Sequence, residues 1–514
     1  MKFNTFSELR EFIRRYNSTS VLEIGAKRCW QIWEAKALSS SDWVSSNAER
    51  NYAIRLILLS SKGNPHRQGK IDVQRFDELI NVYHNWDKHT ISDKEFLKRE
   101  AILLYNLIEQ WEHNNSNTVR NWSLKLSSTL NLKAIRANIY GLFLQRIGAF
   151  QNSGFGSPTS RIERTIKLVK LLDDQSENNF SNSFSRSSEL SPEIYFKFFL
   201  VCLHSFSCSS TKKGFCNLSE LLEIDSELWK SGITSENLKL FIRKNSLPFC
   251  SQADASFRSR VSSSLSNTSD FYQPFFYNHL LEVPLIELTG EKFCMPDPFS
   301  FTESCWNRIA SVVSENRQVK KKLGNLLSKA FESYLEKILF SSICADSFQK
   351  ISEVKCPSSK KDKRADFLIE TKTAYIVIEC KNSVMSSDTS SCFQAEKVAD
   401  LWCRIHSACE QISATVEAFQ IYDKPVIPLV LVFYDSIAAS IVFKEIVKGA
   451  DYCSLLNLSM PPVVYSIHEF EHLISHRSLN NWSELILSGQ DGSSSIPPDN
   501  KGHNYEHLRD SLIF

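Results

Sequence analysis

The feature that most constrains the fold is a continuous apolar run at residues 426–433, VIPLVLVF. A strand that carries helices on both faces needs such a run, whereas a strand with one solvated face alternates apolar and polar residues. From about residue 320 onward, the segments around this run alternate between helical and strand patterns. This order predicts an α/β domain in which helices cover a central sheet.

Residue spacing predicts the elements of this domain. A helix over 323–340 places Leu327, Phe331 and Leu335 on one side. It is followed by strands at 348–355, 365–370 and 374–380, a long amphipathic helix at 391–420, the strand at 426–433, a helix at 437–447 and a short strand at 462–466. The resulting αβββαβ core predicts a mixed sheet flanked by helices.

The rest of the chain divides by composition. Residues 1–270 predict a mainly α-helical region of unidentified role, residues 271–485 the α/β domain, and residues 486–514 a flexible tail. Stretches rich in Ser, Asn and Gly at 151–160, 174–192 and 251–270 are typical of linkers. The aromatic side chains of Trp30 and Trp33 are expected in the core of the helical region.

Composition excludes several classes of function. The chain of 514 residues has 60 Lys and Arg against 58 Asp and Glu, so nucleic-acid affinity must come from local basic patches. Its 15 glycines form neither a complete phosphate loop nor a dinucleotide fingerprint, which predicts no nucleotide cofactor. Its 14 cysteines show no C-x-x-C pair and favour reduced thiols in a cytoplasmic protein. We expect no signal peptide and no membrane span.

Two motifs suggest zinc, but neither is a convincing zinc site. Cys202, His204, Cys208 and Cys216 match no established ligand spacing. The segment 468–472 reads HEFEH, the HExxH signature of zinc proteases. Its second inner position is charged, and no third ligand stands at the usual spacing, so we expect a surface helix there.

A cluster of charged residues lies where two of the predicted strands meet. Asp366 opens one strand, and Glu379-Cys380-Lys381 ends the next. Residues two apart on a strand share a face, so Glu379 and Lys381 point the same way and Cys380 points to the opposite one. Because a hairpin joins the strands, we expect Asp366 to reach the same place. An ordinary ion pair on a solvated strand is the alternative interpretation.

This combination suits hydrolysis of a phosphodiester bond. Carboxylate oxygens, with a backbone carbonyl and water, are the ligands that Mg²⁺ prefers, and Mn²⁺ has a similar preference. The metal would polarise the phosphoryl oxygen and lower the pKa of a bound water. The ammonium of Lys381 could orient that water or stabilise the developing negative charge.

The pattern of Asp366 followed by Glu379-x-Lys381 resembles the PD-(D/E)xK nuclease superfamily, which has the restriction-endonuclease-like fold. The resemblance covers about residues 280–480 and includes Glu332 in the preceding helix and Gln411 in the following one. It implies a catalytic set of Asp366, Glu379, Lys381, Glu332 and Gln411, and metal ligands from Asp366, Glu379, Glu332 and the Cys380 carbonyl. The family's usual proline is replaced by Ala365.

The resemblance also implies a function. Relatives cut DNA in restriction, repair and recombination, and an unassigned region beside one nuclease domain is most similar to a bacterial defence nuclease acting on phage or mobile DNA. A second subunit or a homo-oligomer is a possible partner. The alternatives are a catalytically silent DNA-binding or assembly module and an RNA-directed nuclease. A basic run before Asp366 would contact DNA phosphates: Lys360, Lys361, Lys363 and Arg364.

Overall fold

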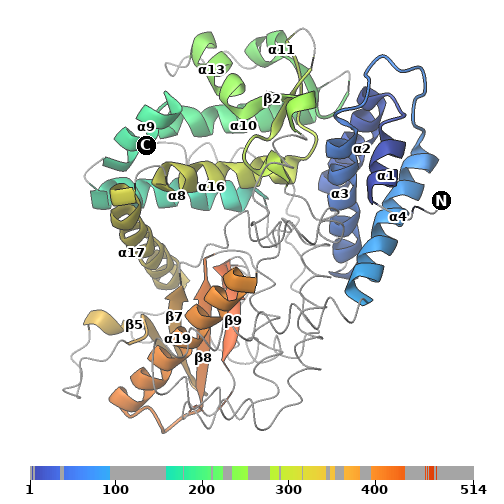
Figure 1. The fold of residues 1–514 in the computed structure, drawn as a ribbon. Coiled ribbons are helices and arrows are strands. Elements are labelled where there is room, and N and C mark those ends of the chain that lie inside the picture. Colours follow the sequence, from blue (N-terminus) through green and yellow to red (C-terminus); the bar gives the residue numbers. More distant parts are fainter. Residues whose placement is uncertain are drawn as a thin grey trace.

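We analysed a computed structural model of the chain. It describes residues 3, 6–34, 40–92, 158–176, 179–209, 212–223, 234–252, 278–288, 291–314, 317–342, 348–353, 364–381, 395–433, 458, 460, 462–467 and 470–471. Figure 1 shows a helical part on the right and at the top, and a separate, larger sheet at the lower left. None of the helices among these residues is long and apolar enough to cross a membrane.

The N-terminal part is helical, as predicted. It contains α1 (Phe6–Ile13), α2 (Ser18–Glu34), α3 (Ser40–Ser60) and α4 (Val73–Ser92). Helices α2 and α3 lie side by side in a bundle that Figure 1 draws in blue. Trp30 and Trp33 are buried, which confirms that they are core residues. The indole Nε1 of Trp30 donates to the carbonyl of Met295 at 2.9 Å and so joins α2 to a distant part of the chain.

Further helices follow, including two segments that were expected to be linkers. They are α8 (Pro158–Ser176), α9 (Asn179–Ser188), α10 (Pro192–Cys208), α11 (Leu218–Glu223) and α13 (Ser235–Asn245). The linker prediction for 174–192 is wrong, because α8 ends and α9 runs within it. The prediction for 151–160 is wrong at 158–160, which open α8, and the remainder of 151–160 lies outside the described residues.

The serine-rich helix α9 forms because its two phenylalanines are buried. Phe180 and Phe184 stand one helical turn apart, are fully buried and lie with ring centroids 6.2 Å apart. At the start of the helix, the amide of Ser181 donates to Asp173 Oδ1 at 2.7 Å. Burial of the two rings outweighs the low helix propensity of Ser and Asn. The composition of the segment reflects only that low propensity and so favours a linker.

A small sheet joins the two sides of the expected boundary at residue 270. Its strand order is β1-β4-β3-β2, with β1 (Phe215–Asn217), β2 (Ser246–Pro248), β3 (Leu285–Glu287) and β4 (Lys292–Cys294). Strand β1 pairs with β4 antiparallel, and β2 pairs with β3 parallel. Of the linker predicted at 251–270, residues 251 and 252 end a described segment. The rest of that linker lies outside the described residues.

The large sheet has the mixed topology predicted from the sequence. Its order is β5-β6-β7-β8-β9, with β5 (Phe348–Lys350), β6 (Phe367–Glu370), β7 (Tyr375–Lys381), β8 (Val426–Val432) and β9 (Val463–Ser466). The pairs β5–β6 and β6–β7 are antiparallel, and β7–β8 and β8–β9 are parallel. Every residue of β8 is buried, as its apolar run required. The first strand is shorter than expected, because a 3₁₀ turn at Ile351–Glu353 ends it.

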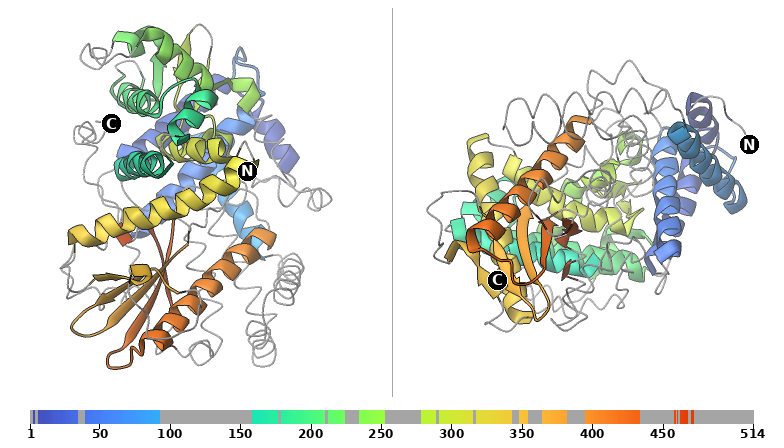
Figure 2. Two further views of the ribbon diagram at one scale, coloured as in Figure 1. Left: turned by 90° about the vertical axis from the view of Figure 1, so that its left-hand side faces the viewer. Right: turned by 90° about the horizontal axis from the view of Figure 1, so that it is seen from below.

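Two long helices lie against this sheet. Helix α17 (Arg317–Ser342) follows α16 (Pro298–Ser314), and Figure 2 shows it running between the helical part and the sheet. Phe331 of α17 meets Phe433, just after β8, with ring centroids 4.8 Å apart. Helix α19 (Ala395–Phe419) lies against β7 and β8. The helix predicted at 437–447 and the tail predicted at 486–514 lie outside the described residues.

Candidate active site at the end of strand β7

The hairpin β6–β7 brings Asp366 next to the end of β7. The register pairs Phe367 with Ile378, and the amide of Asp366 donates to the carbonyl of Ile378 at 3.0 Å. This alignment places the Asp366 carboxyl beside the last residues of β7, where its Oδ2 accepts a hydrogen bond from the amide of Cys380 at 2.7 Å. The two parts of the predicted constellation therefore meet.

Glu379 and Lys381 share one face of β7, as the period-two geometry predicts. The Nζ of Lys381 lies 2.6 Å from Glu379 Oε1 and 2.5 Å from Gln411 Oε1 of α19. Cys380 points the other way and packs against the large hydrophobic cluster that contains Phe331 of α17. The pKa of the Cys380 thiol is raised by burial and then by the charge of Asp366, to which the thiol also hydrogen-bonds, so this cysteine is a poor nucleophile.

Helix α19 also holds the backbone that leads into Asp366. The side-chain amide of Gln411 donates to the carbonyl of Arg364 at 3.1 Å. The hydroxyl of Thr415, one turn further on, accepts from the amide of Ala365 at 2.8 Å and lies 2.7 Å from the carbonyl of Gln411. Ala365 is thus fixed by a hydrogen bond that a proline at this position could not make.

Burial makes ionisation of the carboxyl groups in this site costly in free energy. Glu379 is 3% exposed, and burial, followed by the nearby charge of Asp366, raises its pKa to about 8. Burial also raises the pKa of Asp366. Glu332 on α17 is half-buried, and its pKa is raised by burial and then by Asp366. Three carboxyl groups that resist ionisation near one another are the arrangement that an added cation would stabilise.

The second carboxyl oxygen of Glu379 lacks an N–H donor, and the carboxyl forms a side-chain hydrogen bond with Asp366 when one of the two groups is protonated. That oxygen, Oε2, is buried and accepts no hydrogen bond from a described N–H group. A buried acceptor without a donor costs about 1–3 kcal/mol, and more when it is charged. Hard carboxylate oxygens of this kind suit Mg²⁺ or Mn²⁺, so the donor set of Asp366 and Glu379 fits such an ion.

The described residues do not present a complete set of side-chain metal ligands. No group of three or more His, Cys, Asp or Glu side chains able to hold a metal ion occurs among them. An ion held by Asp366 and Glu379 would therefore complete its coordination with water and backbone oxygens, as Mg²⁺ commonly does. The ligand roles assigned to Glu332 and to the Cys380 carbonyl stay predictions.

The predicted DNA-contact loop is described at one residue. Lys360, Lys361 and Lys363 lie outside the described residues. The guanidinium of Arg364 lies over the ring of Phe419 with its carbon 5.9 Å from the centroid, so its side chain stacks on the end of α19. Its backbone carbonyl has a separate contact, with Gln411.

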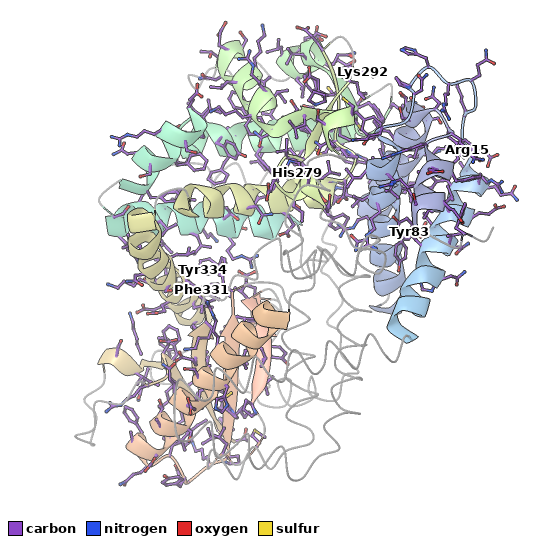
Figure 3. The ribbon with its side chains drawn as sticks, in the orientation of Figure 1. Arg15, Tyr83, His279, Lys292, Phe331 and Tyr334 are labelled. Atoms are coloured by element: carbon purple, nitrogen blue, oxygen red, sulfur yellow. The ribbon has the colours of Figure 1, made fainter. Side chains whose placement is uncertain are left out.

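The HExxH segment is held by contacts unrelated to metal binding. His468, Glu469 and His472 lie outside the described residues, whereas Glu471 is described. Glu471 Oε2 pairs with Arg164 of α8 at 2.9 Å, and its Oε1 accepts from the hydroxyl of Tyr334 at 2.5 Å. Figure 3 labels Tyr334 beside Phe331 on the part of α17 near the sheet. Glu471 therefore connects three segments far apart in the sequence.

His406 and the cysteines of the possible zinc cluster are two further sets of potential metal ligands. His406 of α19 is buried, and burial lowers its pKa to about 4, so the imidazole is neutral at pH 7. Among the cysteines of the possible zinc cluster, Cys202 and Cys216 are buried while Cys208 is exposed. The sulfur of Cys208 lies 3.9 Å from Nδ1 of His204, but no three such side chains among the described residues form a group that could hold a metal ion.

Sequence reasoning missed Thr415 and the role of Glu471. Thr415 is fully buried on α19, and its only sequence signal is its position four residues after Gln411. We found no match to the chain among protein-family models, curated proteins or solved structures. The family resemblance therefore rests on the residues of the site and on the order of the elements that carry them.

Proposed function

We propose that this protein is a metal-dependent nuclease that hydrolyses phosphodiester bonds in DNA. The observation that carries the proposal is the meeting of Asp366, Glu379 and Lys381 at one end of β7, where the carboxyl of Glu379 is buried beside that of Asp366. An ordinary ion pair on a strand needs neither burial of the carboxylate nor a second carboxylate beside it. The mixed sheet and its two helices are compatible with the resemblance.

The residues have distinct roles in this proposal. Asp366 and Glu379 would hold the metal, which supplies a Lewis acid and an activated water. Two of the three N–H donors of Lys381 are used by Glu379 and Gln411. The third donor is available to orient the attacking water or to stabilise charge on the phosphate. Gln411 fixes the ammonium and, through Arg364, the entry to Asp366.

The test is a cleavage assay with the purified full chain. Linear duplex, circular duplex and single-stranded DNA, and RNA, are each incubated with Mg²⁺ or with EDTA. We expect DNA cleavage that EDTA abolishes and added Mg²⁺ restores, and no cleavage by Asp366→Asn. Binding of DNA without cleavage would favour the silent module, and cleavage of RNA alone the RNA-directed enzyme. Cleavage that survives exhaustive chelation would contradict the mechanism.

We propose a role in defence against phage or mobile DNA on the resemblance alone. A bacterial host expressing the wild-type chain should form fewer plaques with at least some phages than a host expressing Asp366→Asn at the same level. Equal plaque numbers across a broad phage panel would leave the nuclease proposal intact and remove the defence role.

A further inference from the structure

A loop between α3 and α4, residues 61–71, is fixed in place although most of it is exposed. The amide of Asn17 donates to the carbonyl of Gly69 at 2.8 Å, and its side chain donates to the carbonyl of Arg67 at 3.1 Å. The amide of Ile71 donates to the hydroxyl of Ser20 at 3.2 Å. We call this segment the basic loop. Its side chains therefore project from a backbone that is tied to the start of α2.

The basic loop and the neighbouring end of α1 present an excess of positive charge. Arg15, Arg67 and Lys70 are exposed, as is His66, and residues 61–71 (SKGNPHRQGKI) include no acidic residue. Within the described part of the chain, the side chains of Arg15, Arg67 and Lys70 form no hydrogen bond and no ion pair. Figure 3 shows Arg15 on the outer side of the bundle, away from the sheet β5–β9.

Two other cations of the same bundle, Arg28 and Arg75, are neutralised. Arg28 pairs with Glu49 at 3.0 Å and with Asp77 at 2.5 Å. Arg75, which follows the basic loop on α4, pairs with Glu78 at 2.6 Å. Acidic side chains therefore neutralise Arg28 between helices and Arg75 within α4. The cations of the basic loop are different, because their mutual repulsion is not offset by such pairs.

The chemistry of the basic loop favours a phosphate backbone as its ligand. Between residues 61 and 70 it has no apolar side chain larger than proline and no Phe, Tyr or Trp. It therefore lacks the apolar surface that would enter a membrane and the rings on which bases would stack. Guanidinium and ammonium groups on a fixed backbone are suited to phosphate contacts that carry no sequence preference.

We propose that the basic loop, with Arg15, is a second DNA-binding surface that contacts the duplex backbone away from the site on β7. The choice of DNA among polyanions rests on the proposed function. Figure 1 places this loop at the upper right and the sheet β5–β9 at the lower left, so the two surfaces belong to different parts of the molecule. The surface would add affinity for duplex DNA without contributing to chemistry.

The test compares two triple variants of the full chain that lose the same charge. One is Arg15→Ala/Arg67→Ala/Lys70→Ala, and the other is Arg186→Ala/Lys239→Ala/Arg243→Ala, which removes exposed cations from α9 and α13. Binding of a fluorescent duplex is followed by anisotropy in EDTA, between about 50 and 300 mM KCl. Each lost phosphate contact lowers the slope of log affinity against log salt by about 0.9.

We expect the first variant to bind more weakly and to lose about two to three from that slope. The second variant should bind as the wild type does, within about twofold. Three results would each overturn the inference. They are equal slopes for both variants, no binding of the duplex by the wild type, and binding of polyglutamate, measured by competition, that is as strong as binding of the duplex. Because the measurement is made without metal, it is independent of cleavage. A wild-type protein that binds through this loop but never cuts would refute the nuclease and leave the surface in place.

Discussion

Glu379 is a carboxyl group at the end of a strand whose other inward-facing positions are apolar. The strand β7 buries Ile376, Val377 and Ile378, and the same burial raises the pKa of Glu379 to about 8. A buried ionised carboxylate destabilises a fold unless it is paired and hydrogen-bonded. Lys381 satisfies one of its oxygens and leaves the other without an N–H donor. Glu379 thus lowers the stability of the fold at the position where the proposed chemistry needs a carboxylate.

We predict that Glu379→Gln stabilises the metal-free protein at high pH and abolishes cleavage. A raised folded-state pKa means that the carboxyl contributes stability below its usual pKa of about 4.5 and loses it as pH rises through about 8. Glutamine does not ionise, so its protein avoids that loss. Thermal melting in EDTA at pH 9 should show a midpoint at least about 2 °C above the wild type.

The control for this prediction is Glu370→Gln. Glu370 ends the neighbouring strand β6, is exposed and pairs with Lys424 at 2.5 Å. Its replacement should raise neither the midpoint at pH 9 nor its dependence on pH. A Glu379→Gln protein that melts below the wild type at pH 9 would mean that the carboxylate is well solvated or well paired after all.

Lys381 tests whether the ion pair serves chemistry or only the strand. Lys381→Ala should still bind Mg²⁺ and DNA, because Asp366 and Glu379 remain, yet lose on the order of a hundredfold in cleavage rate. Calorimetric titration with Mg²⁺ and single-turnover cleavage measure the two effects separately. A folded Lys381→Ala protein that cuts DNA at the wild-type rate would end the assignment of this residue.

At this scale the sequence predicted what depends on strand geometry and missed what depends on tertiary contact. The shared face of Glu379 and Lys381 follows from a period of two, and the approach of Asp366 follows from a short hairpin. Thr415 could not be identified in this way. A threonine in a long amphipathic helix has many possible partners, and only the folded structure shows that it accepts from Ala365.

Among the elements, α19 fixes the backbone that carries the site. Through Gln411 and Thr415 it binds two consecutive backbone groups, the carbonyl of Arg364 and the amide of Ala365, directly before Asp366. The helix was predicted from its apolar periodicity, and so were the strands of the large sheet. The helix α9 was not predicted, because its composition is dominated by Ser and Asn and its stability comes from the burial of Phe180 and Phe184.

We predict that Thr415→Val destabilises the protein by about 1–3 kcal/mol, because the buried amide of Ala365 loses its acceptor. That amide should then exchange its hydrogen faster, and a higher Mg²⁺ concentration should be needed for half-maximal cleavage. Chemical unfolding and hydrogen exchange give the structural effects. Thr415→Ser keeps the hydroxyl and should recover both. If valine and serine behave alike, the hydrogen bond to Ala365 does not position Asp366.

For the whole molecule, the small sheet and the hydrophobic core both cross residue 270. Strands β1 and β2 precede that residue, and β3 and β4 follow it. One hydrophobic cluster contains Trp30 of α2, Phe199 of α10 and Ile378 of β7. The described residues have the mixed helix and strand content that the sequence predicts. Composition carries no information on which strands pair across a long separation.

We predict that fragments 1–252 and 278–514 associate when they are expressed together. Each fragment alone lacks the partners of its two short strands and exposes part of the shared core. An affinity tag on one fragment should therefore recover the other at about equal amounts. Two fragments that purify separately, each with cooperative unfolding, would instead establish independent domains on either side of residue 270.

The parallel pairing of β7, β8 and β9 gives the enzyme proposed here a route for evolutionary change. Lys381 pairs with Val432, and Val432 pairs with Ser466, so the three strands end side by side. The chain leaves each of them at the edge of the sheet that carries the site. Insertions after any of the three strands would begin beside the catalytic groups while the ladder of backbone hydrogen bonds remained intact. Substrate range could therefore diversify at this rim without a change in the scaffold that holds Asp366.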